Sequence, residues 1–395
     1  MLRPPDRSQG ARMTTVWSFP TRILFGAGTV SEAGAEAKRL GSKTALIVTD
    51  PGVEDAGIAA EVSRALEKGG IVTEMTTGVS TNPTEAEVHA AAEAYREAKA
   101  DLVVGVGGGA PLDVAKLIRL ATTHSLPLAE YDDAIGGDAK ITQPMPPMIA
   151  VPTTAGTGSE VGRSGVVTIA ETNRKTVIFS PRLMPDVAIL DPQLTLSLPA
   201  RLTAATGFDA LTHNVEAYCA KGDHPMADAI ALEGIELIAK HLATAVEDGA
   251  NVEARGAMLK ASMMGAVAFQ KGLGACHALA HPLGAEVGMH HGLANALCLP
   301  AVLDFNRTAA TMRIARIARI LGVKGNDVET LAFECSGKVR ALRNQLGLPS
   351  GLAEAGVEED QLSHLASLAI QDATKEGNPR PCTKDDMLSL YRASM

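Results

Sequence analysis

Short apolar runs alternate with amphipathic stretches along the first half of the chain. Four runs rich in β-branched residues are bounded by Gly, Asp or Pro: KTALIVTD (43–50), GIVTEMTTG (70–78), DLVVGVGGG (101–109) and PMIAVPTT (147–154). Between them, residues 57–70 and 85–100 have apolar side chains at helical spacing. Two further strand-like segments are KTVIFSP (175–181) and DVAILDP (186–192). Strands that alternate with helices indicate a parallel sheet of the doubly wound, Rossmann-like type.

The pattern changes near residue 196. From about residue 200 to the end, the sequence is rich in Ala, Leu, Met and Glu and has long helical periodicities without convincing strand alternation. We therefore expect an α/β domain over residues 14–196 and an all-helical domain over residues 197–395. Residues 1–13 are polar and proline-rich, and we expect a disordered tail there.

The composition is that of a folded protein and excludes several classes of partner. Of the 395 residues, 46% are hydrophobic and 21% charged, which supports a sizeable core and argues against disorder. The net charge of −9 argues against nucleic acid or an anionic membrane as the main partner. It does not exclude an anionic small substrate, because one local arginine can override the average.

Membrane and export signals are missing from the sequence. No uninterrupted apolar run approaches the roughly 18 residues that a membrane helix needs, and the start lacks the apolar core of a signal peptide. The five cysteines are scattered without a C-x-x-C pair, which favours reduced thiols over a disulfide framework. We expect a cytoplasmic protein.

Two glycine-rich loops follow predicted strands. In LVVGVGGGAPLDVAKLI, glycines at 107–109 stand between a strand and a helix, where the backbone can approach a phosphate closely. Alone, this loop is equally well explained as a tight packing turn. The second loop, VPTTAGTGSEVG (151–162), again follows a strand and adds several hydroxyl groups. Two such loops at the ends of strands in one open sheet favour a dinucleotide-binding crevice.

Asp50 ends the first of the predicted strands. A carboxylate there can accept hydrogen bonds from ribose hydroxyls and repel a 2′-phosphate, which would favour NAD over NADP. The alternative is that Asp50 only caps a helix or closes a turn. The sequence leaves both interpretations open.

Histidines and one aspartate are spaced as metal ligands in the second half. Asp209 and His213 lie four residues apart in GFDALTHNVEAY (207–218), so they share one face of a helix. The same spacing separates His277 and His281 in GACHALAHPLGAEVGMHHG (274–292). His290 and His291 are neighbours, about 100° apart on a helix, so at most one should join a site with His277.

A carboxylate with imidazoles suits a divalent transition metal, Fe²⁺ or Zn²⁺, better than Ca²⁺ or Mg²⁺. The competing interpretation is that Asp209 and His213 form an ordinary exposed pair and that the histidines pack in a core. Pro282 follows His281 and disfavours regular helix at that point. We expect a kink there that turns His281 away from His277.

The chain resembles the iron-containing (group III) alcohol dehydrogenases from about residue 14 onward. The resemblance is carried by GGGAPLDVAK (107–116), PTTAGTGSE (152–160), GFDALTH (207–213), HALAHPLGA (277–285), HHGLANALCLP (290–300) and NPRPCT (378–383). It implies a dehydroquinate-synthase-like fold, with a Rossmann-like domain, a helical domain and an active site in the cleft between them.

This resemblance also assigns residues and activity. It implies reversible hydride transfer between a small primary alcohol or aldehyde and NAD, in a homodimer or a higher homo-oligomer. The resemblance implies that the metal, Fe²⁺ with Zn²⁺ as the alternative, is held by Asp209, His213, His277 and His291. His281 matches a non-ligand histidine assigned to proton relay, the alternative being a packing or supporting residue. The implied NAD-binding residues, including Asp50 as the NAD-selective position, are Asp50, Gly107, Gly108, Gly109, Asp113, Thr153, Thr154, Thr157, Ser159 and Lys175.

Three positions depart from the family pattern. Ala110 replaces a usual Ser, His290 stands where Pro often precedes the last metal histidine, and Gly162 with Arg163 replaces a Thr and a variable residue. Arg163 suggests a second hypothesis: the substrate is a small anionic aldehyde, such as a semialdehyde or a sulfonated or phosphonated aldehyde. The alternative is a surface or salt-bridged arginine.

Two rival functions come from other classes. A lyase of the dehydroquinate synthase type shares the fold and the metal site but uses NAD only transiently, so it gives no net NADH from a simple alcohol. A non-catalytic protein with a structural metal would leave two cofactor loops without a purpose. The HPLGA and NPR segments favour the alcohol dehydrogenase branch over glycerol dehydrogenase-like and maleylacetate reductase-like enzymes.

Overall fold

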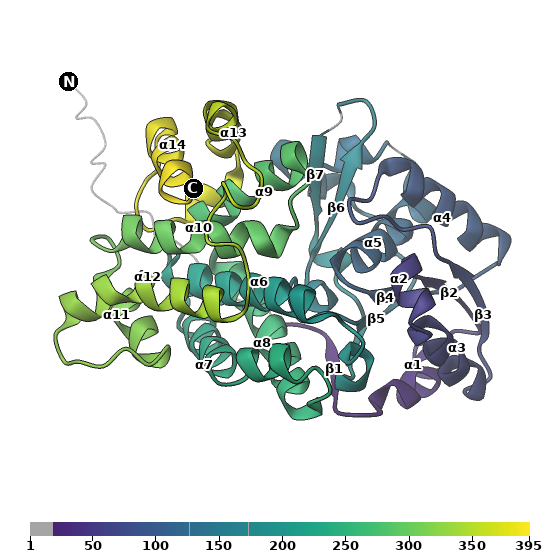
Figure 1. The fold of residues 1–395 in the computed structure, drawn as a ribbon. Helices are drawn as coiled ribbons and strands as arrows, with labels where there is room; N and C mark the ends of the chain where they lie inside the picture. Colours follow the sequence, from purple (N-terminus) through teal and green to yellow (C-terminus); the bar gives the residue numbers. More distant parts are fainter. Residues whose placement is uncertain (1–18, 126, 173) are drawn as a thin grey trace, which may run out of the picture.

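The computed structural model describes residues 19–125, 127–172 and 174–395. The tail predicted for residues 1–13 lies outside these ranges. Figure 1 shows an α/β half and a helical half that lie side by side, with the last two helices placed over α9 and α10. The predicted fold class, a parallel α/β part followed by an all-helical part, is confirmed.

Six parallel strands form the sheet of the α/β half. Their spatial order is β1-β8-β5-β4-β2-β3. The strands are β1 (Arg22–Phe25), β2 (Thr44–Val48), β3 (Val72–Thr76), β4 (Leu102–Gly107), β5 (Met148–Pro152) and β8 (Val187–Leu190). The sequence pattern missed β1, because a strand of four residues at the sheet edge has too few positions to show alternation.

Helices cover both faces of this sheet. Alternate residues of the central strands point to opposite sides. Leu46 and Val103 pack with α4 (Glu85–Glu97) and α5 (Gly109–Thr123). On the other face, Ile47, Val104 and Ile149 pack with α1 (Ala33–Arg39) and α3 (Ile58–Lys68). The sheet is therefore buried on both sides, as its near-continuous apolar strands require.

A separate antiparallel hairpin follows the second glycine loop. It consists of β6 (Ser164–Ile169) and β7 (Arg174–Phe179), paired so that Thr168 lies opposite Lys175 and Ser164 opposite Phe179. The strand predicted over 175–181 thus belongs largely to this hairpin and not to the parallel sheet. Val167 and Ile169 point inward and join the core on α5, which fixes the hairpin against the α/β half.

The second half consists of helices, with no strand among its described residues after Leu190. The nine are α6 (Ala200–Cys219), α7 (Pro225–Glu247), α8 (Val252–Ala268), α9 (Ala275–Val287), α10 (His291–Asn306), α11 (Thr311–Ile320), α12 (Val328–Gln345), α13 (Leu362–Ala369) and α14 (Lys384–Ala393). Helix α6 is buried along nearly its whole length and packs against α7, α8 and α10. It is the central helix of this half.

Candidate active site

The two glycine loops lie against each other at the carboxyl ends of β4 and β5. Gly107 pairs with Pro152 in the sheet, and its φ of +149° suits glycine. A Cβ on Gly108 would lie 3.3 Å from Thr154 Oγ1, and one on Gly109 would lie 2.8 Å from Thr157 Cγ2. Only glycine lets the first loop approach the second this closely.

The first turn of α5 lies at this junction. Helix α5 begins at Gly109, and its N-cap residue Gly108 offers no side-chain hydrogen bond to the first turn. The start of a helix in this state is suited to an anion such as a phosphate. Thr153 is buried and donates its backbone N–H to the Gly107 carbonyl at 2.9 Å, so it ties the two loops together.

Asp50 lies beside the first glycine loop. It is the N-cap of α2 (Pro51–Asp55), where its Oδ1 accepts a hydrogen bond from the Val53 N–H at 3.0 Å. Its other oxygen lies 3.2 Å from the place that a Cβ on Gly107 would occupy. One oxygen of Asp50 therefore caps the helix, as one interpretation predicted. The second oxygen lies next to the first glycine loop. A contact with ribose stays a prediction.

A buried network of charged and hydroxyl groups joins the loops to the hairpin. Asp113 accepts from Ser159 Oγ at 2.6 Å and from the Val166 N–H at 3.1 Å. Lys116, fully buried, donates to Ser159 Oγ at 2.6 Å and to the Ser164 carbonyl at 2.8 Å. Sequence reasoning quoted Lys116 within a motif but gave it no role. Its position three residues after Asp113 on a helix was the available signal.

Lys175 extends from β7 toward the helical half. It donates to Asn82 Oδ1 at 3.4 Å, and burial lowers its pKa. Its positive charge also contributes to the lowered pKa of His291, behind burial and the neighbouring histidines. The hairpin thus brings a lysine from the α/β half toward the histidines of the helical half.

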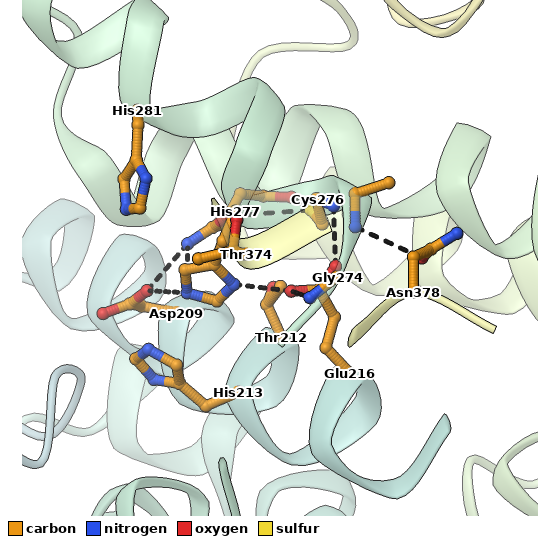
Figure 2. Close-up of polar contacts among 12 residues, drawn as sticks. Asp209, Thr212, His213, Glu216, Gly274, Cys276, His277, His281, Thr374 and Asn378 are labelled. Atoms are coloured by element: carbon orange, nitrogen blue, oxygen red, sulfur yellow. Dashed lines mark hydrogen bonds and ion pairs between the residues drawn. The ribbon is translucent and has the colours of Figure 1, made fainter. Parts of the chain in front are cut away.

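Helices α6, α9 and α10 bring the predicted metal ligands together. Figure 2 shows the Asp209 carboxylate beside the rings of His213 and His277, which stack on each other with centroids 4.6 Å apart. One ligand atom from each of these three buried residues lies within 4.8 Å of the others. His291 lies beside this group rather than within it, with its Nε2 3.5 Å from Asp209 Oδ1. His281 is also adjacent, its ring centroid 6.0 Å from that of His277.

The histidine rings are oriented by protein acceptors. His277 Nδ1 donates to Glu216 Oε2 at 2.6 Å, and His213 Nδ1 donates to the Gly156 carbonyl at 3.3 Å. Each ring therefore keeps its Nε2 for the centre, and the Nε2 of His277 is 3.9 Å from Asp209 Oδ1. A ring whose second nitrogen is held by a carboxylate or carbonyl is the usual arrangement of a metal-binding histidine.

Glu216 and Asn295 complete the centre, and sequence reasoning missed both. Glu216 also accepts from the backbone N–H groups of Gly274 and Cys276, at 3.1 and 2.6 Å. Asn295 donates to Asp209 Oδ1 at 2.8 Å. The signals were present: Glu216 is seven residues after Asp209 on the same helix face, and Asn295 is four residues after His291.

The charge states of the cluster suit a divalent cation. Burial would raise the pKa of Asp209, but the nearby histidines and Asn295 lower it to about 2. Burial lowers the pKa of His213 to about 4 and that of His291 well below its usual value. At neutral pH the centre therefore offers an ionised carboxylate and two neutral imidazoles, the states in which these groups bind metals. His277 differs, because Glu216 outweighs burial and raises its pKa.

His281 sits over His291 and is held by a carboxylate. The two rings are stacked, with centroids 5.4 Å apart, and His281 Nδ1 lies 2.7 Å from Asp372 Oδ2. Regular helix is not lost at Pro282, as its local preference predicted, because α9 continues through it to Val287. Packing of α9 on α10 and α13 outweighs the local preference of proline. His281 consequently stays on the side of His277.

The late NPRPCT segment supports the start of α9. Asn378 accepts from the Ala275 N–H at 3.2 Å and exchanges hydrogen bonds with Asn306 at 2.9 and 2.7 Å. A Cβ on Gly274 would lie 2.8 Å from both Asn378 Oδ1 and Glu216 Oε1. Figure 2 shows Gly274 between these two side chains. This segment therefore fixes the turn from which His277 projects.

Comparisons with known proteins decide the family. The model of the iron-containing alcohol dehydrogenases matches residues 20–192, and that of the C-terminal part of the same family matches residues 203–395. The chain belongs to the iron-containing alcohol dehydrogenase family. The enzymes of this family use NAD and iron, and the chain is accordingly an oxidoreductase of the alcohol dehydrogenase type.

Individual relatives agree over nearly the whole chain. The 4-hydroxybutyrate dehydrogenase of Cupriavidus necator is 42% identical over 95% of this chain and 99% of that protein. A crystal structure of 1,3-propanediol oxidoreductase superposes with a TM-score of 0.94 at 38% identity, covering 97% of this chain and all of the other. The sulfoacetaldehyde reductase of Bifidobacterium kashiwanohense, solved with NAD⁺, has a TM-score of 0.85 at 32% identity, covering 96% and 98%.

Departures from the pattern of the iron-containing alcohol dehydrogenases have modest structural effects. Ala110 packs partly buried against the α4–α5 core. At Gly162, a Cβ would be 3.4 Å from Lys116 Nζ, an ordinary contact. His290 is the N-cap of α10, and its buried Nδ1 has no hydrogen-bond partner among the described residues. Across the described ranges, no helix has the length and apolar character needed to span a bilayer.

Proposed function

We propose that this iron-containing alcohol dehydrogenase interconverts small primary alcohols and aldehydes with NAD(H), using Asp209, His213, His277 and His291 as metal ligands. The observation that carries the proposal is the buried carboxylate–imidazole cluster around Asp209. Fe²⁺ is the proposed ion, with Zn²⁺ as the alternative. The imidazoles of His277 and His213, with their Nδ1 atoms held by Glu216 and by the Gly156 carbonyl, support a transition metal over Ca²⁺ or Mg²⁺.

In the proposed reaction, the metal ion, NAD and the residues of the protein have separate roles. Bound here, the ion supplies a Lewis acid for the substrate oxygen, since deprotonating an alcohol at neutral pH otherwise costs about 12 kcal/mol. The glycine loops, with Thr154, Thr157 and Ser159, hold the NAD pyrophosphate through backbone N–H groups and hydroxyls. Asp113 fixes Ser159 and the hairpin. Asp50 selects against a 2′-phosphate.

His281 is the proposed proton carrier. Its Nδ1–H donates to Asp372, whose carboxylate is held by Thr374, so Nε2 is the atom that exchanges protons. About a third of the His281 side chain is exposed to solvent, whereas the His277 side chain is buried. A group that contacts both the stacked His291 and solvent is placed to pass a proton outward.

Three broader features belong to the same proposal. We infer a division into an α/β domain over 14–196 and a helical domain over 197–395, assembly into a homodimer or higher homo-oligomer, and a cytoplasmic location. The free cysteines, four of them buried, support a reducing compartment. Light scattering after size exclusion will measure the assembly.

A panel of alcohols and aldehydes with NAD(H) tests the function, using apoprotein reconstituted separately with Fe²⁺ and Zn²⁺. We expect NADH formation from primary alcohols with at least one metal and none after chelation. The lyase would instead be identified by two results together. No alcohol would give net NADH, and bound NAD would be reduced and then reoxidised within each catalytic cycle.

A further inference from the structure

The side-chain amide of Asn295 faces three of the proposed metal ligands. Asn295 is fully buried in α10, one helical turn after His291. Its Nδ2 lies 2.8 Å from Asp209 Oδ1, 3.4 Å from His277 Nε2 and 3.3 Å from His291 Nε2. These three side chains come from α6, α9 and α10. One amide group therefore reaches ligand atoms from every helix that builds the centre.

The orientation of this amide is fixed from both of its ends. A carboxylate only accepts hydrogen bonds, so the NH₂ group of Asn295 must face Asp209 and its carbonyl must point away. On that other side, Cys276 Sγ lies 3.6 Å from Asn295 Oδ1 and 3.5 Å from the Asn295 backbone carbonyl. The buried thiol is thus placed to donate to these oxygens. A reversed amide would bring an oxygen against the carboxylate and an N–H against the thiol.

Asn295 also holds the Asp209 carboxylate in place. The Oδ1 atom of Asp209 accepts the hydrogen bond from Asn295 at 2.8 Å. The histidine nitrogens lie further from this oxygen, His291 Nε2 at 3.5 Å and His277 Nε2 at 3.9 Å. The contact with Asn295 is therefore the one that directs this oxygen.

The orientation of the amide decides which donor atoms the centre offers to an ion. An amide carbonyl is a hard oxygen donor of the kind that Ca²⁺ and Mg²⁺ prefer, and carboxylates and carbonyls also suit Mn²⁺. An N–H group cannot bind a cation. Because Asn295 turns its NH₂ group inward, its oxygen does not join the Asp209 carboxylate, and imidazoles remain the main donors. This donor set is better suited to Fe²⁺ or Zn²⁺.

We propose that Asn295, held by the Cys276 thiol, fixes the Asp209 carboxylate and keeps an amide oxygen out of the metal centre, which strengthens the preference of the centre for Fe²⁺ or Zn²⁺ over Mn²⁺ or Mg²⁺. This inference rests on the proposed function, because it takes the same residues as metal ligands. Asn295 acts through those ligands, so it is a positioning residue for the ion.

Metal affinities of Asn295 variants test this proposal. Apoprotein is titrated with Zn²⁺ and Mn²⁺ in competition with a chelator. Asn295→Asp keeps the shape but replaces the NH₂ group by an oxygen, and we expect the ratio of Zn²⁺ to Mn²⁺ affinity to fall at least about tenfold. Asn295→Ala removes only the support, so both affinities should fall about 10- to 100-fold while their ratio changes less than about threefold. Asn326→Asp, the same change at an exposed position, should leave both affinities unchanged.

Two variants of Cys276 test the orientation of the amide, and they keep the proposal testable if the Asn295 variants fold poorly. Cys276→Ser retains a donor for Asn295 Oδ1, whereas Cys276→Ala removes it. We expect the ratio of Zn²⁺ to Mn²⁺ affinity to fall about threefold or more in Cys276→Ala and to stay near the wild-type value in Cys276→Ser. Both variants keep the backbone N–H that donates to Glu216, so the start of α9 retains that contact.

An unchanged ratio of the two affinities in Asn295→Asp and in Cys276→Ala would overturn the proposal, because a residue that only fills space would lower both affinities alike. The titrations do not depend on turnover. NADH formation by the wild type is measured separately, and its absence with every alcohol and every metal would reject the proposed function while the metal preference could still be measured.

Discussion

The metal centre and the cofactor loops are built by opposite means. The centre gathers bulky, ionisable side chains that are buried and cross-linked, as in the contact of Glu216 with His277. The loops depend on missing side chains, as at Gly109, where a Cβ would meet Thr157 at 2.8 Å. The centre should therefore be most sensitive to changes of charge and donor type. The loops should be sensitive to added volume.

The largest expected effect is loss of the central carboxylate. Asp209→Asn keeps the shape but removes the charge that three histidines surround. We expect metal content to fall below stoichiometry and kcat/KM to drop about 10³-fold or more, corresponding to roughly 4 kcal/mol. Atomic absorption and steady-state kinetics measure both. Asp360→Asn, the same change at an exposed site, should leave both values unchanged.

Glu160 adds a pH dependence to the cofactor side. Burial raises its pKa to about 7, and its Oε1 has no partner among the described residues. Between about pH 4.5 and 7, the Glu160 carboxyl is therefore protonated in the folded protein but ionised in the unfolded chain. This contribution to stability is complete below pH 4.5 and is lost as pH rises through about 7, on the order of 3 kcal/mol.

Denaturant midpoints from pH 4.5 to 8 measure this effect. In Glu160→Gln the fall in midpoint over that range should be smaller than in the wild type. An identical slope in the two proteins would assign the pH dependence to other groups.

A milder change at the metal centre alters Glu216, which orients His277, and leaves the four proposed metal ligands in place. Glu216→Gln weakens the hold on His277 Nδ1 and on the turn at Gly274. We expect metal affinity to fall about 10- to 100-fold, with NAD binding unchanged. Competition with a chelator measures the first and fluorescence titration the second. A fall in NAD affinity of the same size would show that the two regions are not separable.

The reciprocal change adds one methyl group to the first loop. Gly109→Ala forces Thr157 aside, and overpacking of this kind costs about 1–3 kcal/mol. We expect the KM for NAD to rise about tenfold while metal content is retained. Gly337→Ala is the matched control, since a Cβ on that exposed helical glycine meets nothing within 4 Å. If metal is lost as well, the loop also supports the centre.

The smallest expected effect separates the two roles of Asp50. Asparagine caps a helix as well as aspartate does, so Asp50→Asn should keep the hydrogen bond to Val53 and the melting temperature. Without the charge, kcat/KM with NADP should rise about tenfold relative to NAD. Unchanged cofactor preference would leave Asp50 as a helix cap only.

How far the sequence predicted these regions follows from their construction. The order of strands and helices was predictable because each central strand, such as β4, is a continuous apolar run. The grouping of Asp209 with His213 followed from helical spacing, whereas the grouping with His277 needed tertiary structure and entered through the family resemblance. The same helical spacing places Glu216 on the face of Asp209. Its role could not be predicted, because the residue it contacts, His277, is 61 residues away along the chain.

Other features depend on tertiary packing and had no local signal. The helix through Pro282 persists because α10 and α13 hold it. The hairpin was half predicted, because β6 begins with Ser164 and Gly165 and its remaining four residues are too few to show a clear pattern. Asp372, the partner of His281, lies 91 residues away along the chain. No spacing rule reaches that far.

Gly292 limits how this enzyme can be altered. A Cβ there would lie 2.2 Å from the Ala205 carbonyl oxygen, so α10 and α6 touch backbone to backbone just beside His291 and Asp209. Any larger residue would wedge these helices apart and separate the two side chains. Libraries that seek new substrates should therefore leave position 292 fixed.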